Sequence, residues 1–581
     1  MKNIFFKGIL AALPLLMAAC SPNSLFDDAP KDKISDEKTW ENAMLLDEYV
    51  NTWYRNMNSG FKTYVPSTAL FKSISRYYLP WFGDQLTNGK SDWYNAGYGD
   101  VLKANEESIT QWARGTWTSC YTQIQYINAF LENMDKVPDA TQRKRVEGEA
   151  HFFRAYYYYM LWRRFGGALL IDHTYDPLTN PEKFPRASYE QMVKFIVDEA
   201  EKAQNLLSAT NSAADVGRIT SGAAIMLKAK TYLWASSTVF QNKTKSYLGF
   251  TDDKSQEMLQ KARAAYDELF ALGTYQLVSI TGTTQDKIRD EYRQIFITKN
   301  TSESILEVQH SNDGDYANKF GHTLDRDAAS PFFTGTTAAY TPTQNHVDEY
   351  GMRGGATYNA QHPYDNRDYR FYANILYNGC SFRDHIMDMA TTDGKAGVDI
   401  TVYGSSTSAA VSRTGYYLGK FVDPTQAIND NDTYASKQNY IIWRLAEAYL
   451  DYAEVCFRLG DTSTALDMVN RIRTRVHMDA LTAVTWNDIV RERRVEMAFE
   501  ETTYWDQLRW GTAERTFSGT TNPLKGMTIT VRSGVTTYRT ANINRFPARV
   551  RKFDAKEYYF PIPWAEVRYQ GIEQNPDWNE V

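Results

Sequence analysis

Two long stretches of the chain combine aromatic rings with polar side chains and have neither a helical nor a strand period. They are residues 61–100 and residues 314–343, and both contain many Gly, Asn, Asp, Ser or Thr. The faces of sugar rings present C–H groups that stack on an indole or phenol ring, while nearby Asp, Asn and Arg side chains hydrogen-bond the hydroxyls. Such loops over a rigid scaffold therefore predict a non-enzymatic binding site for saccharides. The candidate binding residues are Trp81, Asp84, Asn88, Trp93, Tyr94, Tyr98, Tyr316, Arg326, Phe332 and Phe333.

The same rings have a structural alternative, in which they pin long loops to the rest of the fold. The chain contains 40 Tyr, 14 Trp and 28 Phe, and folded proteins place most such rings in the core. The formal net charge is -6 and no basic tract compensates it. This charge argues against a nucleic-acid partner.

Motifs that mark common catalytic or metal centres are absent from the sequence. It contains no H-E-x-x-H, G-x-S-x-G or G-x-x-x-x-G-K pattern, and its eight His are scattered. Glu496, Glu500 and Glu501 form a tempting carboxylate cluster, but their arginine neighbours favour a charge network that packs helices. A glycosidase needs two carboxyl groups roughly 5 to 9.5 Å apart, a separation that a sequence does not show. We therefore expect a binding protein with no catalytic residues, no cofactor and no bound metal.

The elements that must position the two loops are helices. Helical periodicity and start signals predict helices over residues 36–56, 107–134, 141–165, 188–207, 220–236 and 255–272. Ser188 and Gln191 have the spacing of a capping box. Helix pairs joined by short connections cannot bury both faces alone, so they should stack as a solenoid-like array.

A further helix pair is predicted near the C-terminus, over residues 440–476. Apolar residues recur at three- and four-residue steps from Ile442 to Phe457. Gly460 suits the left-handed residue after a helix, and Asp461 suits the N-cap of the next one. A tight turn should therefore fold the two helices into an antiparallel pair of tetratricopeptide size.

Two more elements flank this pair. A third helix is expected to begin at Thr485, where Asp488 completes a capping box, and to end at Gly511. Between residues 275 and 440 the periodicity weakens, and a short strand is expected at residues 305–309.

The first twenty residues have the parts of an export signal. Lys2 and Lys7 precede an apolar run over residues 9–17, which is too short to span a bilayer. Met-Ala-Ala-Cys resembles a lipoprotein cleavage box, which would make Cys20 the first mature residue and the site of lipid attachment. The alternative is an ordinary signal peptide with an incidental Cys. The polar segment that follows, to residue 35, is interpreted as a tether.

Several motifs in the C-terminal part are similar to those of one known family. They are R-L-A-E-A-Y-L-D-Y-A-E at residues 444–454, N-R-I-R at 470–473, E-R-R-V-E-M-A-F-E at 492–500 and W-D-Q-L-R-W-G at 505–511. Together they resemble the C-terminal signature of the SusD/RagB family, surface lipoproteins with which Bacteroidota capture nutrients.

This resemblance implies a fold and a division of the chain. The expected fold is mainly α and SusD-like, with tetratricopeptide-like helix pairs as the scaffold beside an irregular loop-rich lobe with a few short strands. The expected parts are a lipoprotein signal peptide, a lipidated tether, an N-terminal helical region and a C-terminal region that includes the helix pair. Their boundaries are residues 1–19, 20–35, 36–272 and 273–581.

The resemblance also implies a function. It predicts a lipid-anchored protein on the extracellular side of the outer membrane that captures oligosaccharides or polysaccharides and delivers them to a SusC-like TonB-dependent transporter. Two alternatives remain open. One is the capture of peptides or protein fragments, which would need pockets for side chains and backbone groups. The other is a structural lid without ligand affinity of its own.

Overall fold

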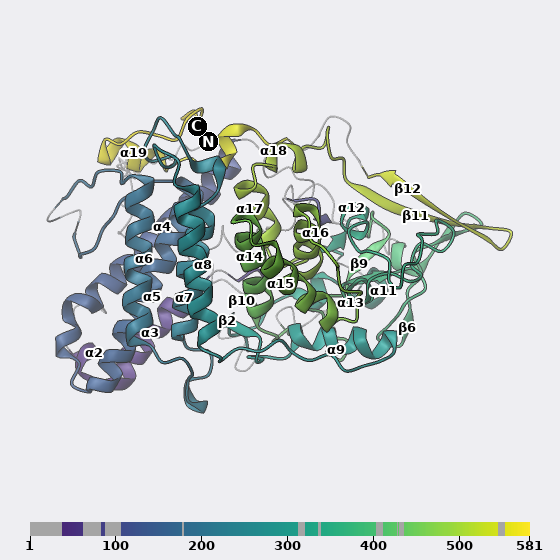
Figure 1. Ribbon diagram of the computed structural model, residues 1–581, viewed down its shortest axis with the longest axis horizontal. Coiled ribbons are helices and arrows are strands. Elements are labelled where there is room, and N and C mark those ends of the chain that lie inside the picture. The colour runs from purple at the N-terminus through teal and green to yellow at the C-terminus, as the bar shows by residue number, and fades with distance from the viewer. Residues whose placement is uncertain are drawn as a thin grey trace, which may run out of the picture.

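The computed structural model describes residues 38–57, 59–61, 83–87, 106–176, 179, 181–311, 320–334, 338–401, 411–426, 428, 435–543 and 552–580. Figure 1 shows an elongated molecule, with the helices of the first half at one end and the C-terminal helices in the middle. Short strands and loops occupy the other end. Within the described residues, no helix is both long enough and apolar enough to cross a membrane.

The helical end consists of elements close to those predicted. They are α2 (Lys38–Glu41), α3 (Ala43–Arg55), α4 (Glu106–Asn133), α5 (Ala140–Phe165), α6 (Tyr189–Leu206), α7 (Ser221–Ala235) and α8 (Ser255–Ala271). The capping box of Ser188 and Gln191 is present at the start of α6. Consecutive helices from α4 to α8 pack on one another, as an array of antiparallel helices requires.

Helix α5 lies in the core of this end, because α4, α6 and α7 all pack against it. Its four consecutive tyrosines, residues 156–159, point in different directions around the helix and are all buried. The hydroxyl of Tyr157 donates to the carbonyl of Trp53 over 2.8 Å, and that of Tyr158 donates to the carbonyl of Ile171 over 3.0 Å. These rings therefore serve packing and cross-links between helices.

The C-terminal helices extend the array. They are α14 (Leu445–Arg458), α15 (Thr462–Arg475), α16 (Trp486–Glu496) and α17 (Thr502–Arg509), and α14 packs against α7 and α8. Gly460 has a φ of +86°, and the Asp461 carboxylate accepts a hydrogen bond from the Thr464 backbone N–H. The predicted turn between the two helices is thereby confirmed.

Two predicted helix boundaries in this part are wrong. Residues 440–444 form strand β10 (Tyr440–Arg444), which pairs antiparallel with β2 (Ser304–Val308), so the first helix begins only at Leu445. The run of β-branched and aromatic residues before Arg444 favours this strand. The helix that starts after Thr485 is also interrupted, because Phe499 and Glu501 adopt φ values of +67° and +62°.

Most of the remaining elements are short, and most of them lie at the loop-rich end. The helices are α9 (Gln285–Ile297), α10 (Leu324–Asp327), α11 (Pro331–Thr334), α12 (Gln344–Val347), α13 (Tyr369–Asn374), α18 (Ala513–Thr516) and α19 (Trp564–Gln570). The strands are β1 (Leu86–Thr87), β3 (Thr341–Pro342), β4 (Ile375–Tyr377), β5 (Ser381–Phe382), β6 (His385–Ile386), β7 (Thr391–Thr392), β8 (Lys395–Ala396) and β9 (Tyr416–Leu418), together with the hairpin of β11 (Lys525–Arg532) and β12 (Val535–Asn542). This hairpin projects from the loop-rich end, whereas α19 returns to the helical end (Figure 1).

Candidate functional site

The two predicted binding loops meet in the structure. Strand β1 comes from the first loop and pairs antiparallel with β3 at the end of the second, with Leu86 opposite Pro342 and Thr87 opposite Thr341. The Thr341 hydroxyl donates to the Thr87 carbonyl over 2.7 Å. The Thr343 backbone N–H donates to the carbonyl of Gln85 over 3.0 Å. Segments about 250 positions apart in the chain are thus joined at one place, which we call the loop junction (residues 83–87 and 338–343).

Gln85 fixes the loop junction to the C-terminal helices. Its side chain is fully buried and accepts a hydrogen bond from the Phe499 backbone N–H over 3.3 Å. That N–H belongs to the interruption between α16 and α17, where the left-handed conformation of Phe499 ends the helix. The break in the predicted helix therefore supplies a backbone donor for the loop.

Asp84 adds an ion pair to the same attachment. Its carboxylate lies 2.9 Å from the guanidinium of Arg494 and accepts a hydrogen bond from the Asn522 amide over 3.1 Å. Arg494 also contacts Glu349 at 3.2 Å. Because Asp84 is buried and already bound on both sides, its carboxylate holds the first loop in place.

Phe332 and Phe333 form an aromatic platform with His385. The Phe332 ring stacks on the imidazole, with centroids 3.7 Å apart and planes at 9°, and keeps 47% of its surface exposed. Phe333 meets both rings edge-on. Arg326 lies half-buried on the neighbouring helix α10.

Asp399 fixes the orientation of His385 and, through it, of the aromatic platform. This carboxylate is fully buried and lies 2.8 Å from the Nε2 of His385. It also accepts hydrogen bonds from the Ser330 hydroxyl and from the backbone N–H of Asp388. Since the imidazole cannot turn without losing this contact, the Phe332 ring rests on a fixed support.

The other predicted binding residues lie outside the described part of the chain. They are Trp81, Asn88, Trp93, Tyr94, Tyr98 and Tyr316, and the lipidation candidate Cys20 lies outside it as well. The sequence reasoning in turn missed Gln85, His385 and Asp399. No periodicity or motif marks these three, because their roles come from contacts with distant residues. Gln85 had only one signal, its position beside Asp84 in the first aromatic loop.

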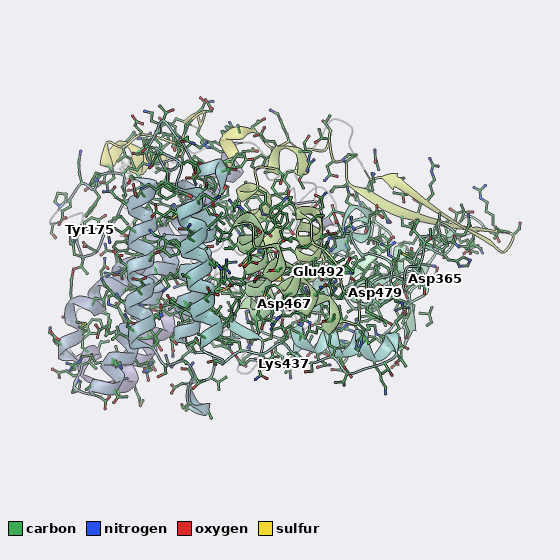
Figure 2. The ribbon with its side chains drawn as sticks, in the orientation of Figure 1. Tyr175, Asp365, Lys437, Asp467, Asp479 and Glu492 are labelled. Atoms are coloured by element: carbon green, nitrogen blue, oxygen red, sulfur yellow. The ribbon has the colours of Figure 1, made fainter. Side chains whose placement is uncertain are left out.

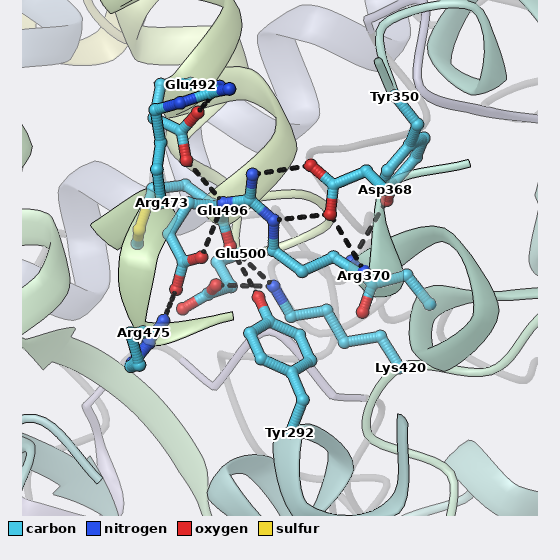
Figure 3. A network of polar contacts seen from close by, with 12 residues as sticks. Tyr292, Tyr350, Asp368, Arg370, Lys420, Arg473, Arg475, Glu492, Glu496 and Glu500 are labelled. Atoms are coloured by element: carbon cyan, nitrogen blue, oxygen red, sulfur yellow. Dashed lines mark hydrogen bonds and ion pairs between the residues drawn. The ribbon is translucent and has the colours of Figure 1, made fainter. Parts of the chain in front are cut away.

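The carboxylates that could have suggested catalysis are buried in ion pairs (Figure 3). Arg444 contacts Glu303, Glu496 and Glu500 at 2.7, 2.8 and 2.7 Å. Arg370 contacts Glu496 at 3.0 Å, and Lys420 contacts Glu500 at 2.6 Å. The predicted charge network is confirmed for Glu496 and Glu500.

The protonation states of this network follow from opposing effects. Burial alone would raise the pKa of Glu496, but the guanidinium groups of Arg475, Arg444 and Arg370 outweigh burial and hold that pKa well below its ordinary value. Burial lowers the pKa of Lys420 to about 8.

Figure 2 places Glu492, a partner of Arg370, among the helices in the middle of the molecule, whereas Asp365 lies towards the loop-rich end. In the network, Glu496 and Glu500 are buried and bound by cations of the surrounding elements.

Taken together, these features define a mainly α scaffold protein that holds loops from two distant stretches at one place. A model of the SusD family matches residues 302–578, and a second SusD-like model, described as starch-binding and associating with the outer membrane, matches residues 28–233. The chain belongs to the SusD family. The resemblance found in the sequence and the expected fold class are therefore confirmed.

Individual relatives agree with this assignment. The chain is 25% identical over 532 residues to a SusD-like protein of Bacteroides ovatus, covering 87% of this chain and 83% of the relative. A crystal structure of a SusD-like protein from Bacteroides fragilis matches with a TM-score of 0.72 and 25% identity, covering 95% of this chain and 100% of the other. A structure described as a laminarin-binding SusD-like protein matches with a TM-score of 0.63 and 20% identity, over 93% of this chain and 100% of that one.

Proposed function

We propose that this protein is a surface glycan-binding lipoprotein that captures oligosaccharides at the loop junction and delivers them to a SusC-like TonB-dependent transporter. The observation that carries the proposal is the pairing of β1 with β3, which brings the two aromatic loops to one place. The family model described as starch-binding and the laminarin-binding structural neighbour support a saccharide as the ligand.

The exposed platform suits this ligand. Phe332 offers a flat apolar face supported from behind by His385, and sugar C–H groups pack well against such a face. The predicted rings of the first loop, Trp81 and Trp93 among them, complete the site in this proposal. Arg326 and Asn88 are its proposed hydrogen-bonding partners.

The location and the partner are further parts of the proposal. Attachment of lipid to Cys20 would anchor the chain in the outer membrane, and residues 20–35 would tether the folded part to the extracellular side. From there the protein would pass its ligand to the transporter. In this proposal the glycan is bound without being cleaved, and the paired and buried carboxylates of Glu496 and Glu500 support this part of it.

The test is calorimetry of the mature protein with a panel of plant, host and microbial glycans, followed by chromatography of the recovered ligand. At least one glycan should bind and be recovered intact. The Trp81→Ala and Trp93→Ala variants should weaken binding by about tenfold or more, because buried stacking rings dominate such sites. Trp564→Ala on α19 is the matched control and should bind as the unchanged protein does.

Three results would overturn the proposal in different ways. Binding of peptides in place of glycans would support the alternative of peptide capture. Co-purification with the transporter without affinity for any ligand would support a structural lid. Shortened products in the recovered glycan would indicate an enzyme.

A further inference from the structure

A cavity of about 830 Å³ lies beside the loop junction but opens between the C-terminal helices. Its wall is formed by the end of α14, the start of α16, the end of α17 and residues 512–522, with Asp84 and Arg494 on one side. This volume is typical of sites for small molecules. Among the described residues of 314–343, which are 320–334 and 338–343, none lines the cavity, so it is a different place from the platform of Phe332.

Three aromatic rings make one side of the cavity. Trp486 and Trp510 meet edge to face with centroids 5.6 Å apart, and Phe457 lies 6.3 Å from Trp486. All three side chains are half-buried, so each keeps part of its surface open. The indole N–H of Trp510 donates to the fully buried Glu454 over 3.1 Å, which fixes the orientation of that ring. The rings therefore form a preformed apolar wall.

A saccharide site also needs polar groups that can hydrogen-bond hydroxyls. Gln507 and a residue at the rim of the cavity supply them. The Gln507 side chain is 4% exposed, and its carbonyl oxygen accepts hydrogen bonds from the hydroxyls of Thr512 and Thr516. Gln507 is one of the residues that line the cavity, and its amide nitrogen forms no hydrogen bond with another described residue. This nitrogen is not one of the buried side-chain atoms left without a partner, so it keeps some accessible surface and can donate a hydrogen bond to a ligand hydroxyl. Asn487 adds an exposed amide at the rim.

Most of the charged side chains that line the cavity form ion pairs with described residues, and one arginine does not. Asp84 and Glu349 pair with Arg494, while Glu454 pairs with Arg509 and Arg458. Arg515 on α18 also lines the cavity, is exposed and forms no ion pair with any described residue. Its guanidinium is available for a carboxylate or sulfate of a ligand, with which it can form two parallel hydrogen bonds.

We propose that this cavity is a second saccharide site, specific for sugars that carry a carboxylate or sulfate group. Sugar rings pack against Trp486 and Trp510, the Gln507 amide donates to a hydroxyl, and Arg515 binds the anionic group. The inference rests on the proposed function, because it takes the ligand to be a saccharide. The second site adds a separate binding location and a class of sugar to that function. With two sites, the protein would bind two segments of one anionic glycan.

The experiment is calorimetric titration of the mature protein with trigalacturonate and with a sulfated chondroitin oligosaccharide, and with maltotriose as the neutral counterpart. The anionic sugars should bind more tightly than the neutral one, and added salt should weaken them. Arg515→Gln should lower affinity for the anionic sugars about fivefold and reduce the salt effect, as expected for an exposed ion pair. Trp486→Ala should lower affinity about tenfold or more.

Controls separate this site from the first one. Arg491→Gln changes an exposed arginine that does not line the cavity, on helix α16, which also carries Trp486; this variant should bind as the unchanged protein does. Arg515 is exposed, so its variant should fold even if Trp486→Ala does not. The second site is overturned if the anionic sugars bind no better than maltotriose, or if they bind both cavity variants as tightly as they bind the unchanged protein.

The failure of the proposed function gives a different pattern. In that case no glycan of the wider panel binds at all, and both proposals fall together. If glycans bind and only Trp81→Ala and Trp93→Ala weaken them, the proposed function stands and the second site is wrong.

Discussion

The helix array and the loop junction differ in the range of the contacts that form them. In the array from α4 to α8, each helix packs against the next one along the chain, and some begin with a local cap, as α6 does with its Ser188 and Gln191 capping box. The loop junction depends on contacts between residues hundreds of positions apart, such as Gln85 with Phe499. The array thus supplies a scaffold, and the distant contacts place the loops on it.

Of the predicted changes, removal of the Arg444 guanidinium from the scaffold should lower the free energy of unfolding the most. In Arg444→Met, Glu303, Glu496 and Glu500 lose a buried partner at once, so the free energy of unfolding should fall by roughly 3 to 5 kcal/mol. Denaturant unfolding followed by circular dichroism measures the loss. The control is Arg471→Met, which removes a half-exposed ion pair with Asp467 and should cost less than about 1 kcal/mol. Equal losses in the two variants would show that the network does not stabilise the scaffold.

A buried carboxylate that forms no ion pair with another described residue should give the next largest effect on the free energy of unfolding, and this effect should depend on pH. Burial raises the pKa of Glu566 on α19 to about 7, above the ordinary value of 4.5 that it regains on unfolding. Its contribution to stability is therefore complete below pH 4.5 and is lost as the pH rises through 7, by at most about 3 kcal/mol. Glu566→Gln should flatten the decline in unfolding free energy between pH 5 and pH 8. A decline of the same slope in the variant would show that another group causes it.

Loosening the loop junction should have a smaller and more local effect. Gln85→Ala removes the hydrogen bond that the Phe499 N–H donates to the Gln85 side chain and should cost about 1 to 2 kcal/mol. Hydrogen exchange should accelerate at the amides of Phe499 and Thr343 while those of α5 stay protected. The exposed Gln361→Ala serves as the control. Faster exchange throughout α5 would contradict the view that the junction is a separate, local attachment.

The sequence predicted the array well because its signals are local. Caps at Ser188, Asp461 and Thr485 and the left-handed Gly460 all operate within one helical turn, and each is found where it was expected. The errors have non-local causes. Residues 440–444 become a strand because β2 lies beside them, and the helix after Thr485 breaks where Phe499 meets Gln85.

The candidate site was predicted only in part, for the same reason. Residue types identified the two aromatic loops, and Phe332 is indeed exposed. Composition could not show that β1 pairs with β3, that His385 supports Phe332, or that the Asp84 carboxylate is bound by Arg494. Each of these facts depends on a partner far away in the chain. Trp81, Trp93 and the other rings of the first loop stay predictions.

The central claim, that the two loops form one glycan site, is tested most directly by a double-mutant cycle. Calorimetry would give the affinity of the bound glycan for the unchanged protein, Trp93→Ala, Phe332→Ala and the double variant. If both rings contact the same ligand, the two losses should be coupled by more than about 0.5 kcal/mol. Losses that add within about 0.3 kcal/mol, or the absence of any loss from either variant, would contradict a single site at the loop junction.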